Sequence, residues 1–93
     1  MNMILVFGDR SNEWKKDDPA YNRAFVEAQM KYAKDIFDTK GWLYLRQLHD
    51  MLGLDAHHIA SVMGWDFVDS FEFSIEEPDE NGFIRIHHNA RAI

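Results

Sequence analysis

The pattern of apolar and polar positions along the chain predicts a strand, a long helix, two shorter helices and a C-terminal hairpin. Residues 3–7 (MILVF) are apolar throughout and are followed by Gly8, which is typical of a short buried strand. Asp18 and Pro19 form a strong helix start, because a carboxylate caps the first turn and proline lacks the N–H that would be left unpaired there. We expect this helix to cover residues 19–39.

The predicted long helix has an unusually broad apolar side. Apolar side chains cover about half of its circumference, whereas a surface helix normally carries an apolar stripe a little over 100° wide. Either the helix lies beneath the rest of the domain on two sides, or it offers a second apolar strip to a partner, for example in a homodimer through Tyr21–Phe37. We favour the intramolecular alternative, because small domains are often built around one central helix.

Residues 43–63 predict a helix-turn-helix pair. The leucines within residues 45–52 are spaced like one face of a helix, Gly53 suits a left-handed turn, and a second short helix is expected before the next glycine. A long helix before such a pair and a hairpin after it are the parts of a winged helix. We therefore expect one α+β domain over residues 1–93, with the order β-α-α-α-β-β and a winged-helix-like centre.

Residues 66–88 have the pattern of a β-hairpin. The first strand is expected to place its apolar side chains on one side: Phe67, Phe71, Phe73 and Ile75. The pair Asn81-Gly82 is a strong signal for a hairpin turn. A four-residue loop over residues 79–82 would place Ile75 opposite Ile86, which puts an apolar pair inside and supports this register.

Composition narrows the class of protein. The 93 residues are 46% hydrophobic and contain no cysteine, so we expect a single core without disulfides or thiol chemistry. A membrane-spanning helix needs about 18 consecutive apolar residues, and the chain contains no such run. The opening residues lack the basic stretch and the cleavage site of a secretory signal. We expect a cytoplasmic protein.

The net charge of −6 is concentrated in the second half of the chain. Residues 1–46 carry eight basic and seven acidic side chains, whereas residues 47–93 carry two basic and nine acidic ones. An acidic surface repels the phosphate backbone, and the second short helix also lacks the Arg, Lys, Gln and Asn side chains that read base edges. A winged-helix transcription regulator, whose dimer would contact DNA through Arg10, Lys15 and Lys16, is therefore the alternative and not the main hypothesis.

The residues that we expect to contact a partner fall into three groups. Trp14 lies in a polar loop where nothing obvious would bury it, whereas Trp42 and Trp65 are assigned to the core. The second short helix offers His57, His58 and Ser61. The hairpin offers Glu72, Glu76, Glu77, Asp79 and Glu80. These carboxylates either imitate phosphates for a nucleic-acid-binding protein or form a solvated edge that prevents aggregation, and we favour the solvated edge.

We expect no enzymatic activity, no cofactor and no metal ion. Neighbouring histidines in one helix or strand point apart, and no Asp or Glu at helical spacing completes a set of metal ligands. Asp9 follows an apolar strand but has no glycine-rich phosphate loop beside it. Glu76 and Glu77 are expected at an exposed hairpin end, which does not provide the desolvated environment that general acid catalysis needs.

From Phe25 to Gly82 the chain resembles small uncharacterised proteins of bacteriophages and prophages of Gram-positive bacteria. The shared pattern is a long helix, a final hairpin and short motifs: KGWLYL at 40–45, MLGL at 51–54, VMGW at 62–65 and NG at 81–82. The resemblance implies a phage origin and a location in the host cytoplasm, and it brings no catalytic residues. With the charge pattern, it predicts a small acidic protein that binds a host or phage protein and inhibits a host defence or nucleic-acid-binding protein.

Overall fold

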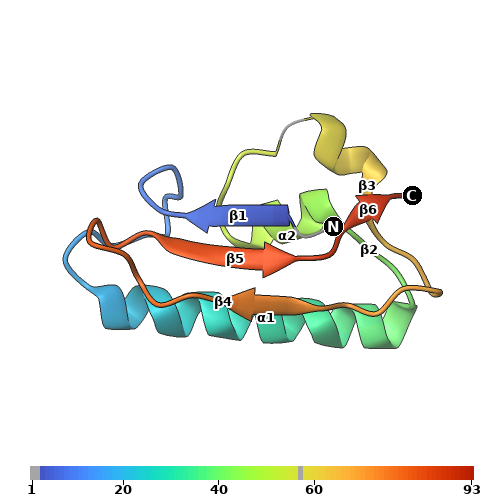
Figure 1. Ribbon diagram of the computed structural model, residues 1–93, viewed down its shortest axis with the longest axis horizontal. Coiled ribbons are helices and arrows are strands. Elements are labelled where there is room, and N and C mark those ends of the chain that lie inside the picture. Colours follow the sequence, from blue (N-terminus) through green and yellow to red (C-terminus); the bar gives the residue numbers. More distant parts are fainter. Residues whose placement is uncertain (1–2, 57) are drawn as a thin grey trace.

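The computed structural model describes residues 3–56 and 58–93, of which His58 and Ile59 are described by their backbone alone. The chain has an α+β fold with two helices and two small antiparallel sheets (Figure 1). The elements are β1 (Met3–Phe7), α1 (Pro19–Lys40), β2 (Leu43–Tyr44), α2 (Leu45–Met51), the 3₁₀ helix η1 (His58–Val62), β3 (Met63–Trp65), β4 (Phe73–Ile75), β5 (Ile84–His88) and β6 (Arg91–Ala92). Sheet A has the order β1-β5-β4, and sheet B has the order β2-β3-β6.

The first strand and the long helix lie where the sequence predicts them, and α1 is one residue longer than expected at its end. The Asp18 carboxylate accepts a hydrogen bond of 3.0 Å from the Tyr21 backbone N–H and caps the first turn. At the other end Gly41 adopts a left-handed conformation with φ 83°, and its N–H donates to the Phe37 carbonyl at 2.7 Å. Local capping signals therefore fix both ends of this helix.

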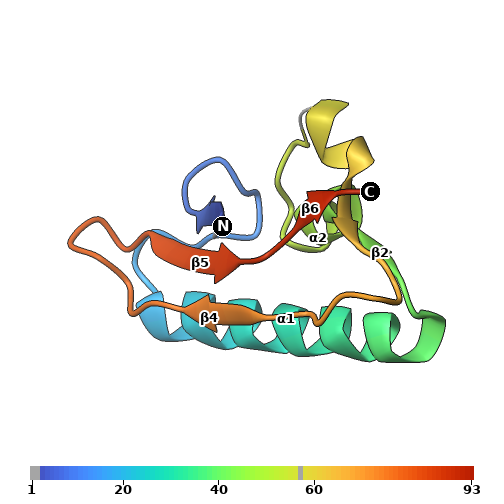
Figure 2. The same cartoon turned by 45° about the vertical axis from the view of Figure 1, so that its right-hand side comes forward.

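Helix α1 runs along sheet A, and sheet B lies near the end of α1 that carries Lys40 (Figures 1 and 2). Val26 and Met30 are fully buried in the core, and the ring of Phe25 stacks on that of Phe7 with centroids 5.4 Å apart. Tyr32, on the outer side of the helix, is 58% exposed. The fold itself therefore covers one part of the broad apolar side of α1 and leaves another part in contact with solvent.

The hairpin register is as predicted, but its first strand is shorter. Ile75 pairs with Ile86, and the N–H of Gly82 donates to the Asp79 carbonyl at 2.9 Å within the turn. Residues 66–72 are not part of this strand. Phe67 is 79% exposed, so the prediction that it faces the core is wrong. The cause is a tight turn in this segment, described below, which removes it from the ladder.

The predicted order β-α-α-α-β-β is wrong between residues 43 and 65. β2 and β3 pair antiparallel with each other, and the second helix of the expected pair is the short 3₁₀ helix η1. A Cβ atom at Gly64 would overlap the Leu43 carbonyl oxygen, so glycine is what allows β2 and β3 to approach. β6 pairs with the other side of β3 and completes a sheet that the sequence does not predict. The winged-helix arrangement is not confirmed.

Candidate interaction surface

Sheet B presents an exposed apolar face at one end of the molecule. Side chains alternate along a strand, so Trp42 and Tyr44 project to the side opposite the buried Leu43, and their rings pack with centroids 5.5 Å apart. Ile93 follows β6, and its N–H donates to the Val62 carbonyl at 3.0 Å. Trp42, Tyr44 and Ile93 line the same shallow hollow of about 300 Å³. Strands from distant parts of the chain thus bring these side chains together.

Phe67 and Val68 lie on a tight turn that starts at Asp66, which also lines this hollow. They are 79% and 70% exposed. The turn is held by the Asp69 N–H, which donates to the Asp66 carbonyl at 2.9 Å, and by the Asp66 N–H, which donates to the Asp69 carboxylate at 2.7 Å. The nearest atom to a Cβ built at Gly41 is the Cβ of Phe67, at 3.7 Å, so Phe67 lies beside the residue that precedes Trp42. We call Trp42, Tyr44, Val62, Phe67, Val68 and Ile93 the apolar face.

An ion pair and a lysine lie at the border of the apolar face. The Arg91 guanidinium donates to the Asp69 carboxylate at 2.8 Å, and this bond, with that from the Asp66 backbone, holds the pKa of Asp69 below its usual value. The Lys40 ammonium lies 5.4 Å from the centre of the Trp42 ring. Soluble monomers rarely expose a large contiguous apolar patch rimmed by polar groups unless it binds something. The arrangement therefore has the properties of a protein-binding surface.

Sequence reasoning missed the apolar face. The pattern assigns Trp42 to the core, but the structure leaves its side chain 41% exposed, whereas Trp65 is fully buried as predicted. Two signals could have indicated the face. Trp42 and Tyr44 alternate around a leucine, and the pair Phe67-Val68 stands between aspartates that favour a turn. Neither signal shows that these segments meet.

The structure gives Trp14 partners within the chain. This side chain is half-buried, and its indole N–H donates to the Gly82 carbonyl at 3.0 Å. The indole also packs edge-on against the ring of Phe83, with centroids 5.5 Å apart. Trp14 therefore fastens the polar loop before α1 to the tip of the hairpin, a contact between residues far apart in the sequence.

Two hairpin carboxylates form ion pairs with arginines of the same chain. Glu77 lies 2.9 Å from the guanidinium of Arg23 in α1, and Asp79 lies 3.3 Å from that of Arg85 in β5. The pKa of Asp79 is lowered chiefly because its carboxylate accepts a hydrogen bond from the backbone N–H of Phe83. These contacts give both carboxylates a partner within the chain, and the Glu77 side chain remains 85% exposed.

The other hairpin carboxylates differ in their contacts. The Glu76 carboxylate contacts the His87 ring nitrogen Nε2 in a side-chain hydrogen bond, and Glu72 accepts a hydrogen bond of 3.4 Å from the Asn89 amide. Glu80 is exposed at the tip and forms no ion pair with any residue of the described ranges 3–56 and 58–93. Of the predicted contacts on this hairpin, Glu80 is therefore the one most available to a partner.

The predicted contact residues of the second short helix are only partly described. His57 lies outside the described residues, and so does the side chain of His58. Ser61 is exposed in η1, next to Val62 of the apolar face. η1 and the hairpin tip lie at different ends of the molecule (Figure 1), so the structure does not gather the three predicted groups into one site.

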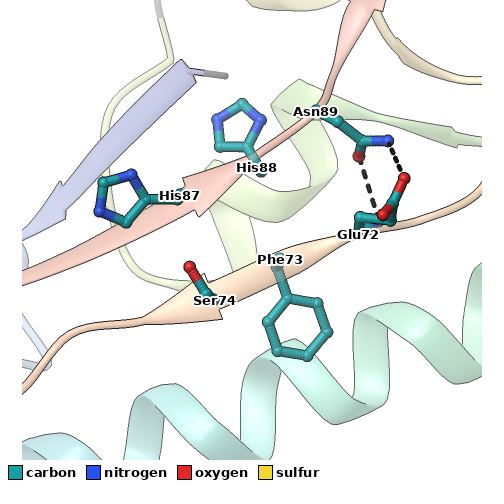
Figure 3. A pocket seen from close by; sticks show the side chains of 6 residues that line it. All are labelled: Glu72, Phe73, Ser74, His87, His88 and Asn89. Carbon is teal, nitrogen blue, oxygen red and sulfur yellow. Dashed lines mark hydrogen bonds between the residues drawn. The ribbon is translucent and has the colours of Figure 1, made fainter. Parts of the chain in front are cut away.

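A small pocket of about 230 Å³ lies where β4 and β5 approach Asn89 (Figure 3). Ser74 stands opposite His87 in the sheet, and His87 in turn contacts Glu76, so the side-chain types of a Ser-His-Glu hydrolase are present. Within the described part of the chain, however, no hydrogen bond joins Ser74 to His87. Without such a contact the serine is not activated as a nucleophile. Among the described residues, the pocket thus holds these three side-chain types without a Ser-His hydrogen bond.

Asn89, at the end of this pocket, connects the two sheets. Its Oδ1 accepts a hydrogen bond of 2.6 Å from the Trp65 indole N–H and one of 3.1 Å from the Glu72 backbone N–H, and its Nδ2 donates to the Ser70 carbonyl at 2.8 Å. Trp65 lies in sheet B, and Glu72 precedes β4 of sheet A. The amide therefore fixes the position of sheet B, and with it the apolar face, relative to sheet A.

Asn89→Ala is expected to lower the free energy of unfolding by about 2 kcal/mol, because a buried donor that loses its acceptor costs about 1–3 kcal/mol. The donor in question is the buried Trp65 indole N–H. Urea denaturation followed by tryptophan fluorescence measures the effect. Asn12→Ala, in an exposed loop, is the control and should change the unfolding free energy by less than about 0.5 kcal/mol. Equal effects of the two substitutions would contradict the connecting role.

Metal binding and membrane insertion find no support in the described residues. Across residues 3–56 and 58–93, no three His, Asp or Glu side chains are grouped so as to hold a metal ion. None of the helices in those ranges is both long and apolar enough to cross a bilayer.

No protein-family model, curated protein or solved structure matches this chain. Its fold and its apolar face are therefore the observations from which a function is inferred. The apolar face is the more informative of the two, because one fold can serve many functions, whereas a surface restricts what can bind.

Proposed function

We propose that this chain is a non-enzymatic protein that acts by binding another protein through the apolar face. The observation that supports this proposal is a set of six large apolar side chains that the fold leaves exposed on or beside sheet B, at the end of η1 and on the turn after β3. Removing apolar surface from water contributes about 25 cal/mol per Å², and Trp, Tyr and Phe are common anchors of interfaces. The turn is held by its own hydrogen bonds, so the backbone of Phe67 and Val68 loses little freedom on binding.

A polypeptide suits this face better than a nucleic acid. Proteins that stack bases on aromatic side chains combine them with a positively charged groove. Here Arg91 is already paired with Asp69, and the chain carries a net charge of −6. A winged-helix DNA regulator remains the second candidate, but η1 has five residues, and a recognition helix must be long enough to lie in the major groove.

The partner that we propose is a host or phage protein, and the consequence of binding is inhibition of a host defence or nucleic-acid-binding protein. The resemblance to phage proteins supports this class of partner and a role in the host cytoplasm. The exposed Glu80 would add a second, electrostatic contact for a partner with a basic surface. The apolar face would supply most of the affinity, since desolvated aromatic anchors usually dominate binding energies.

The double variant Trp42→Ser with Phe67→Ser is expected to weaken partner binding at least tenfold, because each substitution removes an anchor whose loss costs about 1–2 kcal/mol or more at a typical interface. Both side chains are exposed, so the fold should persist. The measurement is capture of one specific protein from a Gram-positive host lysate by immobilised chain, followed by titration of that protein. Tyr32→Ser, which removes an exposed aromatic ring from α1, is the matched control.

Capture that is unaffected by the double variant would contradict the proposal. Replacing Glu76, Glu77, Asp79 and Glu80 by lysine tests the hairpin separately. If the lysine variant alone abolishes binding, the partner contacts the hairpin and not the apolar face. Retardation of duplex DNA by the native chain, with an affinity that falls steeply as salt rises, would instead favour the regulator.

A further inference from the structure

The outer edge of β1 is open. Among the described strands β1 pairs with β5 alone, so it forms one edge of sheet A (Figure 1). Ile4 and Val6 are 56% and 45% exposed, which is unusual for large aliphatic residues in a strand. A groove of about 550 Å³ runs beside them, and its lining is mixed: apolar Leu5, Leu54 and Ala56, and polar Arg10, His49 and Asp55. The edge therefore borders open space.

The main-chain hydrogen-bonding groups of Ile4 and Val6 point to this open edge. The Glu76 N–H donates to the Arg85 carbonyl at 2.9 Å, so the main chain of Arg85 faces β4 and not β1. Val6 is the residue opposite Arg85 in the β1–β5 register. Because the two sides alternate along an antiparallel pair, Val6 and Ile4 direct their N–H and C=O groups away from β5.

The edge of β1 lacks the features with which proteins normally protect an edge strand. Its five residues include no charged residue, no proline and no glycine, and the register with β5 is continuous without a bulge. The other edge of sheet A is different, because β4 has three residues and is flanked by Glu72, Glu76 and Pro78. Charged side chains, proline and short length are the usual protection against edge-to-edge pairing. One edge of sheet A is thus protected and the other is not.

We propose that β1 pairs with β1 of a second copy of this chain, antiparallel about a two-fold axis at Leu5. In this register Ile4 stands opposite Val6 of the second copy, and the outward-facing groups of both residues meet in main-chain hydrogen bonds. The side chains of Ile4 and Val6 from both copies then form one apolar cluster on the exposed surface. The two copies of sheet A become one continuous sheet.

The charge distribution permits this pairing despite the net charge of −6. Phe7 pairs with Ile84, so the acidic hairpin tip of each copy lies beyond the Phe7 end of its own β1. The two-fold axis places the two tips at opposite ends of the paired strands. At about 3.3 Å per residue the five residues of β1 span about 16 Å, and charges at that distance are largely screened at physiological salt, where the Debye length is about 8 Å.

This inference is independent of the proposed function and is tested by the oligomeric state of the full chain. The native chain is expected to shift from monomer to dimer in light scattering across the micromolar to millimolar range. Val6→Pro removes an N–H group at the open edge without removing a hydrogen bond to β5. Ile4→Lys places a charge at the position where the two strands would pair. Both variants should stay monomeric, and their circular dichroism spectra should be unchanged. If Val6→Pro misfolds, Ile4→Lys decides, because the Ile4 side chain is already exposed.

Two control variants distinguish a dimer that pairs through β1 from dimers that use another interface. Tyr32→Lys changes the exposed side of α1, which would form the interface of a homodimer through the long helix, and Phe67→Ser changes the apolar face. Neither should alter the dimer. A native chain that is monomeric throughout overturns the inference, even if it binds a synthetic strand peptide. The inference is also overturned if the Ile4→Lys variant still forms the dimer. It is overturned as well if Tyr32→Lys or Phe67→Ser abolishes the dimer.

Discussion

Gly64→Ala is expected to lower the free energy of unfolding by about 3 kcal/mol or more and to disorder sheet B. A Cβ atom at this position would overlap the carbonyl oxygen of Leu43 and lie 2.9 Å from the Tyr44 Cα. Both atoms belong to the backbone of β2, so neither can turn away as a side chain would. Overpacking usually costs about 1–3 kcal/mol and more where the backbone has to move. Denaturation in urea measures the loss.

Gly8→Ala is the matched control for this prediction. Gly8 is also tightly packed, but the atoms nearest to its added Cβ, at 2.8–3.1 Å, belong to the Phe83 ring. A ring can shift by a small rotation, so we expect a loss at the lower end of the range, about 1 kcal/mol. If Gly64→Ala costs no more than Gly8→Ala, the close approach of β2 and β3 is not what requires glycine.

Acidification from pH 7 to pH 4 is expected to lower the free energy of unfolding by about 3 kcal/mol through His88. Burial lowers the pKa of this imidazole from 6.5 to about 4, and the nearby His49 and His87 add to the effect. The ring packs edge-on against Trp65, and its Nδ1 lies 3.3 Å from the Ala90 N–H, for which it is the acceptor. Protonation of Nδ1 would turn this acceptor into a donor, so that two N–H groups, those of His88 and Ala90, would face each other.

The direction of this stability change follows from the pKa of His88 in the unfolded chain and in the folded chain. Below pH 6.5 the unfolded chain binds a proton at His88 that the folded chain does not bind until about pH 4, so stability falls as the pH drops through this interval. The pKa values of Asp69 and Asp79 lie below 3.8, so the contribution of these carboxylates is lost mainly below the interval. Urea denaturation at several pH values measures the profile.

His88→Asn tests the assignment, because its Oδ1 can take the place of the Nδ1 acceptor but does not titrate in this range. The variant should be nearly independent of pH between 6.5 and 4. If its profile retains the slope of the native chain, other groups cause the acid sensitivity.

The elements that the sequence predicts well are those fixed by local chemistry. Asp18 and Gly41 cap α1 through contacts within a few residues, and the turn around Gly82 sets the register in which Ile75 meets Ile86. Such signals depend only on neighbouring residues, so they predict the same local structure in any fold that contains them.

The elements that the sequence predicts poorly depend on distant partners. The leucines of α2 have helical spacing, and α2 is indeed a helix, but β2 and β3 have two and three residues and form strands because they pair with each other and with β6. Segments of that length carry too little pattern to identify a strand. Gly64 suggests the end of a helix in the sequence, whereas in the fold it allows two strands to approach.

The candidate site could not be predicted for the same reason. Residues 42–44, 62–68 and 93 meet only when sheet B forms, so no local window of the sequence contains the apolar face. Trp14 differs from the apolar face, because here the sequence suggests an exposed side chain and the fold provides partners for it. Its polar surroundings in the sequence suggest an exposed contact, but it forms a hydrogen bond to Gly82, 68 positions away, and packs on Phe83.

The late position of β6 has a consequence for synthesis on the ribosome. β3 obtains its second neighbour from Arg91–Ala92, and Ile93 is part of the surface that we propose for binding. A nascent chain that has reached β3 or even β5 therefore has an unfinished recognition surface. A chain that stops before Arg91 would lack the second neighbour of β3 and Ile93, so we expect such truncated products to bind the proposed partner more weakly than intact molecules.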